Sequence, residues 1–253
     1  MQKQLGFRRN INLSWLDATA ALCSETSDPK QLRARLDPIV AEQVQSYENR
    51  QAAITILLNI WLKIGEQQPE LRNHAVALFA QSNSATDRIW LHYGLSLLAY
   101  PFFRQSMVSI GQLTRYSNGV TPKAIKQRII SEIGQLGGLD KAVDRLLYSL
   151  RNWGLLGDTA QRYTYAPQLT MATHATLECW LLEAALTAHP AQDVPFADLL
   201  RLPELFPFRF TVNIDDLRRT ERFEVQRQGM GWDMVRRVDR SQHSLVGQSP
   251  IHK

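Results

Sequence analysis

The 253-residue chain has only two cysteines, Cys23 and Cys179, far apart and without a C-x-x-C pattern. This scarcity excludes a disulfide framework and gives no zinc site, so we expect both to be small core residues. Long apolar runs are also missing, because "AAITILLNIWL" and "LSLLAYPFF" are shorter than the ~20 residues that cross a bilayer. Asp17 interrupts the apolar part of the N-terminal stretch, which predicts the first helix of a cytoplasmic protein rather than a leader.

Recognisable catalytic constellations are missing too. There is no H-E-x-x-H and no Gly-x-Ser-x-Gly, and "GQLGG" lacks the lysine and preceding strand of a phosphate-binding loop. Two histidine and carboxylate pairs, His92 with Asp87 and His174 with Glu178, have spacings that could meet on a helix. Such pairs are common on ordinary helices, so we predict no enzyme activity, no metal site and no cofactor.

Two further features have structural interpretations. Asp215 and Asp216 are adjacent and therefore point in different directions, which favours capping of a helix N-terminus over paired catalytic carboxylates. Four tryptophans lie on apolar helical faces, which predicts core positions for Trp15, Trp61, Trp90 and Trp180.

Positive charge is concentrated in one quarter of the chain. The formal net charge is +5, and residues 101–165 contain nine basic and four acidic residues, so the remaining 20 basic and 20 acidic residues balance. A local basic excess is typical of a surface that meets phosphates, although it also occurs on ordinary solvated faces.

Periodicity predicts a mainly α protein. Apolar residues recur every three or four positions up to about Tyr100, which indicates a bundle of helices over 14–23, 29–44, 50–65, 69–81 and 84–100. Pro101 disfavours helical geometry at Tyr100 and predicts a bend there. Another helix is expected over 173–189, followed by alternating strands of a small antiparallel sheet over 208–213, 222–228 and 232–238.

The stretch "AVDRLLYSLRNWGLLGDTAQRYTYAP" (142–167) predicts an amphipathic helix followed by a hairpin. Leu139, Val143, Leu146, Leu147, Leu150 and Trp153 share one side of the helix, and the opposite side carries Lys141, Arg145, Tyr148 and Asn152. Cations, a phenol and an amide are groups suited to phosphates and base edges.

A second helix is expected immediately upstream. Thr121 stands at its N-cap and Pro122 at its first position, and Ile125, Ile129 and Ile133 form its apolar stripe. The "QLGG" segment (135–138) then makes a short turn, and Gly157 and Asp158 begin the turn of the hairpin.

This order of elements resembles the winged helix-turn-helix superfamily over about residues 102–168. The resemblance is carried by "AVDRLLYSLRNWGLL", which is similar to a recognition helix that ends in an aromatic residue, glycine and a leucine pair before the wing. It implies duplex DNA as partner, with the helix in the major groove and the wing on the flanking backbone. The predicted DNA-binding residues are Lys141, Arg145, Tyr148, Ser149 and Asn152 on the helix, Gln161 and Arg162 on the wing, and Lys123 and Lys126 upstream.

Two acids depart from the pattern of that superfamily. Asp140 and Asp144 stand at the end of the helix that would enter the groove, where they repel phosphates.

The whole chain also resembles the accessory protein A family of bacteriophage-exclusion (BREX) defence systems. A helical bundle containing "RQAAITILLNIW" is followed by "LLAYPFFRQ", "GVT" and the winged helix. The resemblance implies a non-enzymatic DNA-binding accessory protein that works with other defence proteins. The predicted division is a helical bundle (1–100), a winged helix (101–168), a C-terminal helix plus small β-sheet (169–238) and a disordered tail (239–253).

Two alternatives remain: a transcriptional regulator, and an interaction subunit of a larger defence or regulatory complex. The second rests on Phe206, Phe208 and Phe210, which stand close together in a proline-bounded segment. Phe208 and Phe210 share one face of a strand, so they could instead fill the protein's own core.

Overall fold

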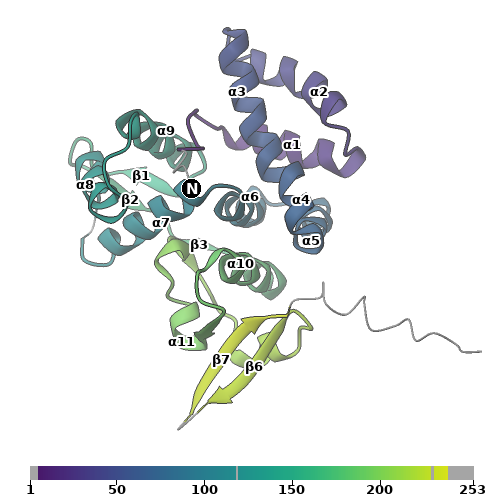
Figure 1. Ribbon diagram of the computed structural model, residues 1–253, viewed down its shortest axis with the longest axis vertical. Helices are drawn as coiled ribbons and strands as arrows, with labels where there is room; N and C mark the ends of the chain where they lie inside the picture. Colours follow the sequence, from purple (N-terminus) through teal and green to yellow (C-terminus); the bar gives the residue numbers. More distant parts are fainter. Residues whose placement is uncertain (1–4, 118, 229–230, 239–253) are drawn as a thin grey trace, which may run out of the picture.

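The computed structural model describes residues 5–117, 119–228 and 231–238, and it is mainly helical as predicted. The predicted tail over 239–253 lies outside these residues. The first half contains α1 (Leu13–Glu25), α2 (Pro29–Ala41), α3 (Tyr47–Leu58), the π-helix η1 (Asn59–Lys63), α4 (Ile64–Gln67), α5 (Pro69–Gln81) and α6 (Ala85–Ala99). These helices form the predicted bundle, shown in purple and blue in Figure 1.

Local sequence explains where the bundle helices begin. Proline occupies the first position of α2 and α5, where its missing N–H costs nothing. The side chains of Asp28, Ser46 and Ser84 cap α2, α3 and α6 by accepting backbone N–H groups.

The core of the molecule is aromatic and extends beyond the bundle. The four tryptophans predicted to be core are all buried, as are both cysteines, which are free thiols. Helix α10 (Ala175–Ala188) packs along α6, where Gly94 leaves room for the ring of Trp180. Buried apolar side chains from all three predicted parts belong to one continuous cluster.

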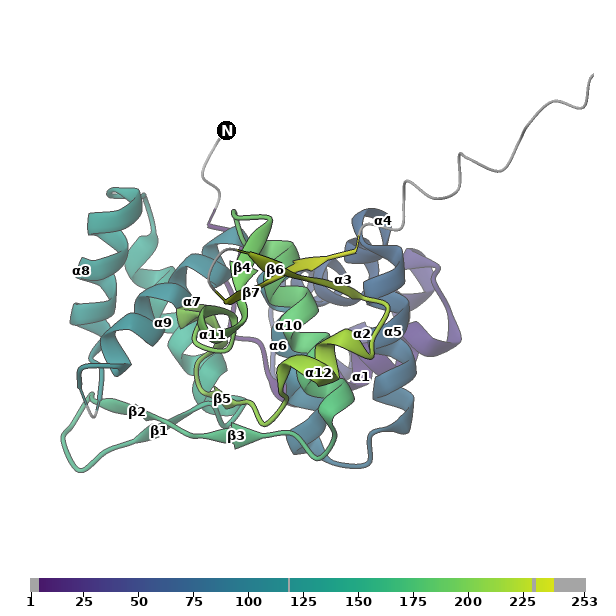
Figure 2. The ribbon, with the colours of Figure 1, turned by 90° about the horizontal axis from the view of Figure 1, so that it is seen from below.

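Residues 101–168 contain three helices and a hairpin, in the order predicted. They are α7 (Pro101–Thr114), α8 (Pro122–Ile133), α9 (Leu139–Asn152), β1 (Leu156–Asp158) and β2 (Tyr165–Pro167). The two strands pair antiparallel, and Val120, just before α8, pairs with Tyr165 in an isolated bridge. Thr121 caps α8 through its hydroxyl, as expected. The hairpin projects at one edge of the molecule (Figure 2).

The C-terminal sheet differs from the prediction in one strand. β6 (Phe223–Gln228) and β7 (Trp232–Arg237) form as expected, but the third strand is β4 (Asp193–Pro195), in the order β4-β7-β6. Residues 208–213 were predicted to join this sheet. Only β5 (Phe208–Arg209) forms a strand within 208–213, and it pairs parallel with β3 (Thr170–Met171). The reason is that Phe208 and Phe210 pack their rings on Trp90 of the bundle, 4.6 and 5.4 Å between centroids.

Short helices complete this region: α11 (Phe196–Leu199), the 3-10 turn η2 (Pro203–Leu205) and α12 (Ile214–Arg218). Asn213 and Asp216 form a reciprocal capping box at the start of α12, so the capping role predicted for the acidic pair is confirmed for Asp216. Among the described residues, no helix is long and apolar enough to span a membrane.

Candidate nucleic-acid interface

Helix α9 separates apolar and polar side chains as its sequence predicts. All six apolar residues of the predicted core face are buried, from Leu139 to Trp153. Lys141 and Tyr148 are exposed on the other side, and Tyr148 retains 42% of its accessible surface. These two side chains fit the predicted interface.

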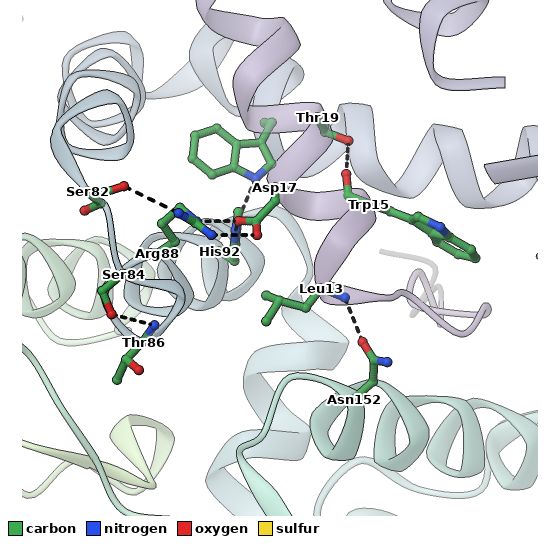
Figure 3. Close-up of polar contacts among 11 residues, drawn as sticks. Leu13, Trp15, Asp17, Thr19, Ser82, Ser84, Thr86, Arg88, His92 and Asn152 are labelled. Atoms are coloured by element: carbon green, nitrogen blue, oxygen red, sulfur yellow. Dashed lines mark hydrogen bonds and ion pairs between the residues drawn. The ribbon is translucent and has the colours of Figure 1, made fainter. Parts of the chain in front are cut away.

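Ser149 and Asn152 of the polar face bind the start of α1 and the segment before it (residues 5–12, the N-terminal segment), although Asn152 remains exposed. Ser149, predicted to face a DNA groove, is fully buried, and its hydroxyl accepts the backbone N–H of Ile11 at 2.9 Å. Asn152 uses its carbonyl oxygen to accept the N–H of Leu13 at 2.7 Å, a contact drawn in Figure 3. The prediction for Ser149 is therefore wrong, because its position on the helix is occupied by the protein's own backbone.

The exposure of Arg145 is intermediate between that of Lys141 and that of the buried Ser149. Arg145 is half-buried, and its guanidinium donates a hydrogen bond to the carbonyl of Arg8. Trp153, at the end of α9, donates its indole N–H to the carbonyl of Ile11 at 2.8 Å. The N-terminal segment is thus fixed along one edge of α9, and helical periodicity alone gave no signal of a contact with residues so distant in sequence.

Lys126 neutralises the two acids at the start of α9. Its ammonium group lies 3.0 Å from Asp144 and 3.4 Å from Asp140. Partial burial lowers the pKa of Lys126, but hydrogen bonds and attraction from the two carboxylates outweigh this and raise it. Lys126, predicted to contact DNA, is therefore engaged in holding α8 to α9.

Lys123 and the hairpin flank a cleft of about 540 Å³ at the start of α8. Lys123, Lys126 and Tyr163 line it, and the first two come from the predicted set. Gln161 and Arg162 are exposed at the tip of the hairpin, and the Arg162 guanidinium lies over the ring of Tyr163, 4.7 Å from its centroid.

After its ion pairs are counted, the stretch over residues 101–168, here called the unit, has more basic than acidic side chains. Each of its four acids has a basic partner inside the unit: Glu132 with Arg128, Asp158 with Arg151, and both Asp140 and Asp144 with Lys126. Arg104 pairs with Glu204 outside the unit. Among the described residues, the basic side chains of the unit without a carboxylate at ion-pair distance are Arg115, Lys123, Lys141, Arg145 and Arg162.

The carboxylates considered for catalysis have structural partners. Glu178 is buried and accepts hydrogen bonds from both backbone N–H groups of Thr211 and Val212 and from the Thr211 hydroxyl. Asp87 accepts the N–H and hydroxyl of Thr173, at the approach to α10. Within the described ranges, no three potential metal ligands gather into a cluster.

His92 lies in a polar cluster of the bundle with Asp17 and Arg88 (Figure 3). Trp61 donates its indole N–H to Nδ1 of His92 at 3.1 Å, so the ring proton lies on Nε2 and meets Asp17 at 2.9 Å. Arg88 binds the same carboxylate through two nitrogens. Complete burial lowers the pKa of His92 despite the opposing effect of Asp17. This cluster is internally paired and suits a structural role.

Comparison of the chain with protein-family models, with curated proteins and with solved structures finds no match in any of the three.

Proposed function

We propose that this protein binds duplex DNA through residues 101–168 and catalyses no reaction on it. The observation that carries the proposal is the surplus of cations in a helix-turn-helix unit that ends in a hairpin. Four of them, Arg115, Lys123, Lys141 and Arg162, are exposed, and exposed cations without carboxylate partners are what a phosphate backbone requires.

The revised interface is narrower than the one expected from sequence. Lys141, Tyr148 and the exposed side chain of Asn152 remain available on α9, and Lys123 stands at the start of α8. Arg115 stands just after α7, and Gln161 and Arg162 stand on the hairpin. Most of these groups suit phosphates rather than base edges, so binding should tolerate many sequences.

The proposed biological setting is a bacterial cytoplasm, where the protein would serve as an accessory component of an anti-phage defence system with other defence proteins. The interaction-subunit alternative loses its main support, because Phe208 is buried and Phe210 packs on Trp90. A role as transcriptional regulator would use the same DNA-binding surface.

Salt titration tests the proposal. Affinity for a labelled duplex, measured by fluorescence anisotropy between 50 and 200 mM salt, should fall with a log–log slope of about −0.9 per phosphate contact, or roughly −3 to −4 for the exposed cations. Lys123→Glu combined with Lys141→Glu should abolish binding.

Lys30→Glu combined with Lys63→Glu is the matched control, because both lysines are exposed in the bundle and the net charge changes equally. The proposal fails if the wild type does not bind at low salt, or if the control variant loses as much affinity. Metal-dependent cleavage of plasmid DNA that survives purification and disappears in Glu178→Ala would contradict the non-enzymatic part.

A further inference from the structure

A second cleft lies where the N-terminal segment crosses α9. Residues from the N-terminal segment, α1, the loop after α2, and α9 line it, including Arg9, Asn12, Trp15, Gln43, Arg145 and Tyr148. In Figure 3 the indole of Trp15 projects from α1 on the side opposite to Asp17, away from the His92 cluster. The cleft has about 250 Å³, below the ~300–1,000 Å³ of sites for drug-sized molecules, and therefore suits one small chemical group.

The cleft is positively charged and its cations have no acidic partners. Arg9 and Arg145 line it, and both guanidinium groups donate to the backbone carbonyl of Arg8. None of these three arginines has a carboxylate within ion-pair distance in the described part of the chain. Burial lowers the pKa of Arg9, and repulsion from Arg145 and Arg8 lowers it further. Like charges held together in this way favour the binding of an anion.

Hydrogen-bonding groups in the wall of the cleft lack partners. Nε of Arg9, Nε1 of Trp15 and Oδ1 of Asn12 are buried and have no hydrogen-bond partner among the described residues. Trp15 and Asn12 are 3% and 6% exposed, so water does not readily compensate them. A buried polar group without a partner destabilises the folded protein, and proteins keep such groups rarely.

The chemistry of these groups specifies the ligand. Arg9 and Trp15 supply N–H donors beside the Arg145 guanidinium, which suits the oxygens of a phosphate. Asn12 is held by donating its amide to Gln43, and its carbonyl oxygen remains to accept a hydroxyl, either of a protonated phosphate or of a sugar. Tyr148 also lines the cleft and is exposed, so its ring is available to a base or sugar attached to that phosphate.

We infer that this cleft is a binding site for a phosphate group, supplied either by a small phosphate ester such as a nucleoside monophosphate or by the backbone of DNA. Only the DNA source rests on the function proposed above. The site is separate from the cleft at Lys123, and it would make the fixed N-terminal segment a direct part of ligand recognition.

The test is binding of inorganic phosphate and of AMP to the full chain, by calorimetry and thermal shift at constant ionic strength. Both ligands should raise the melting temperature of the wild type, because they bind the native state. Arg9→Gln should weaken phosphate binding about tenfold or more, since a charge-assisted hydrogen bond is lost. Trp15→Phe should also weaken it, while leaving the ligand-free protein no less stable, because it removes an unpaired donor.

Lys141→Gln is the matched control, because this exposed cation lies on α9 but does not line the cleft. It should weaken DNA binding and leave phosphate binding unchanged. If Arg9→Gln also weakens DNA binding about tenfold, the phosphate belongs to the DNA backbone; if DNA affinity is unchanged and AMP competes with phosphate, the ligand is a small ester.

The inference is overturned if neither inorganic phosphate nor AMP binds in the millimolar range and both cleft variants keep wild-type DNA affinity. If the protein binds phosphate but not DNA, the phosphate site is supported and the proposed DNA-binding function is wrong. Should Arg9→Gln not fold, the wild-type thermal shift and Trp15→Phe decide the matter.

Discussion

The hydroxyl of Ser149 accepts a hydrogen bond from the backbone N–H of Ile11, which is 138 residues earlier in the chain. Both residues are fully buried, so no water can replace this contact. The same hydroxyl donates to the carbonyl of Arg145 one turn before it on α9. Ser149 therefore attaches the N-terminal segment to α9, the helix for which the sequence predicts DNA contact.

Ser149→Ala should destabilise the protein by about 1–3 kcal/mol, because the buried N–H of Ile11 loses its acceptor. Urea unfolding measures this free energy. Ser131→Ala on the exposed side of α8 is the control, and it should change the stability by less than about 0.5 kcal/mol. DNA affinity should be unaffected in folded Ser149→Ala, whereas direct groove contact by this hydroxyl would lower it.

The contrast between Lys141 and Ser149 shows what the sequence can predict. Helical periodicity places both on the polar side of α9, and the order of helices and hairpin over 101–168 also follows from local patterns. Ser149 is buried against the backbone of Ile11, and the same N-terminal segment packs Phe7 on Trp153 in the shared core, a contact between residues far apart in the sequence. Likewise, apolar and polar residues alternate over 208–213 as in a sheet strand, but Phe208 and Phe210 pack on Trp90 of the bundle instead.

Close packing predicts the effect of adding one methyl group at Gly111. This glycine of α7 faces the backbone carbonyl of Pro203 in η2, and a Cβ there would overlap that oxygen. Gly111→Ala should therefore destabilise the protein by about 1–3 kcal/mol or more, since the backbone must move. Thermal and urea unfolding would measure the loss.

Gly137→Ala is the matched substitution, because a Cβ at Gly137 meets no atom within 4 Å. It should be neutral or slightly stabilising, by up to about 1 kcal/mol, through a lower entropy of the unfolded chain. Equal effects of the two substitutions would argue against the close contact of α7 with η2.

Stability should fall as the pH decreases from 7 to 5. Burial, and then repulsion from Arg222, lower the pKa of His74 from 6.5 to about 4, and burial also lowers the pKa of His92. Below pH 6.5 these two histidines are protonated in the unfolded chain but stay neutral in the native protein. The stability present at pH 7 is therefore lost as the pH falls toward their native pKa values. The slope is at most about 1.4 kcal/mol per pH unit for each histidine.

Urea unfolding at pH 7, 6 and 5 checks this dependence. His74→Gln should reduce the slope, because the unfolded chain then takes up one proton fewer. A stability that stays constant over this range in the wild type would show that neither histidine is held neutral by burial.

The acids at the start of α9 predict a variant with stronger DNA binding. Asp140→Asn combined with Asp144→Asn removes two charges that repel phosphates and releases the ammonium group of Lys126 from its ion pairs. DNA affinity at 50 mM salt should rise several-fold, and the magnitude of the log–log salt slope should increase by about 0.9 if Lys126 gains one phosphate contact. Fluorescence anisotropy over a salt series measures both quantities.

A net-charge control separates this local effect from general attraction. Glu66→Gln combined with Glu70→Gln removes two exposed acids of the bundle, outside residues 101–168, and raises the net charge equally. If α9 and Lys126 lie at the interface, this control should leave the salt slope unchanged and raise affinity far less, because charges more than about 10 Å from the ligand are screened at 0.1 M salt. If DNA affinity rises equally in both double variants, the DNA does not bind at α9. Removal of the acids at α9 has a larger effect than removal of other acids only when the DNA lies next to them.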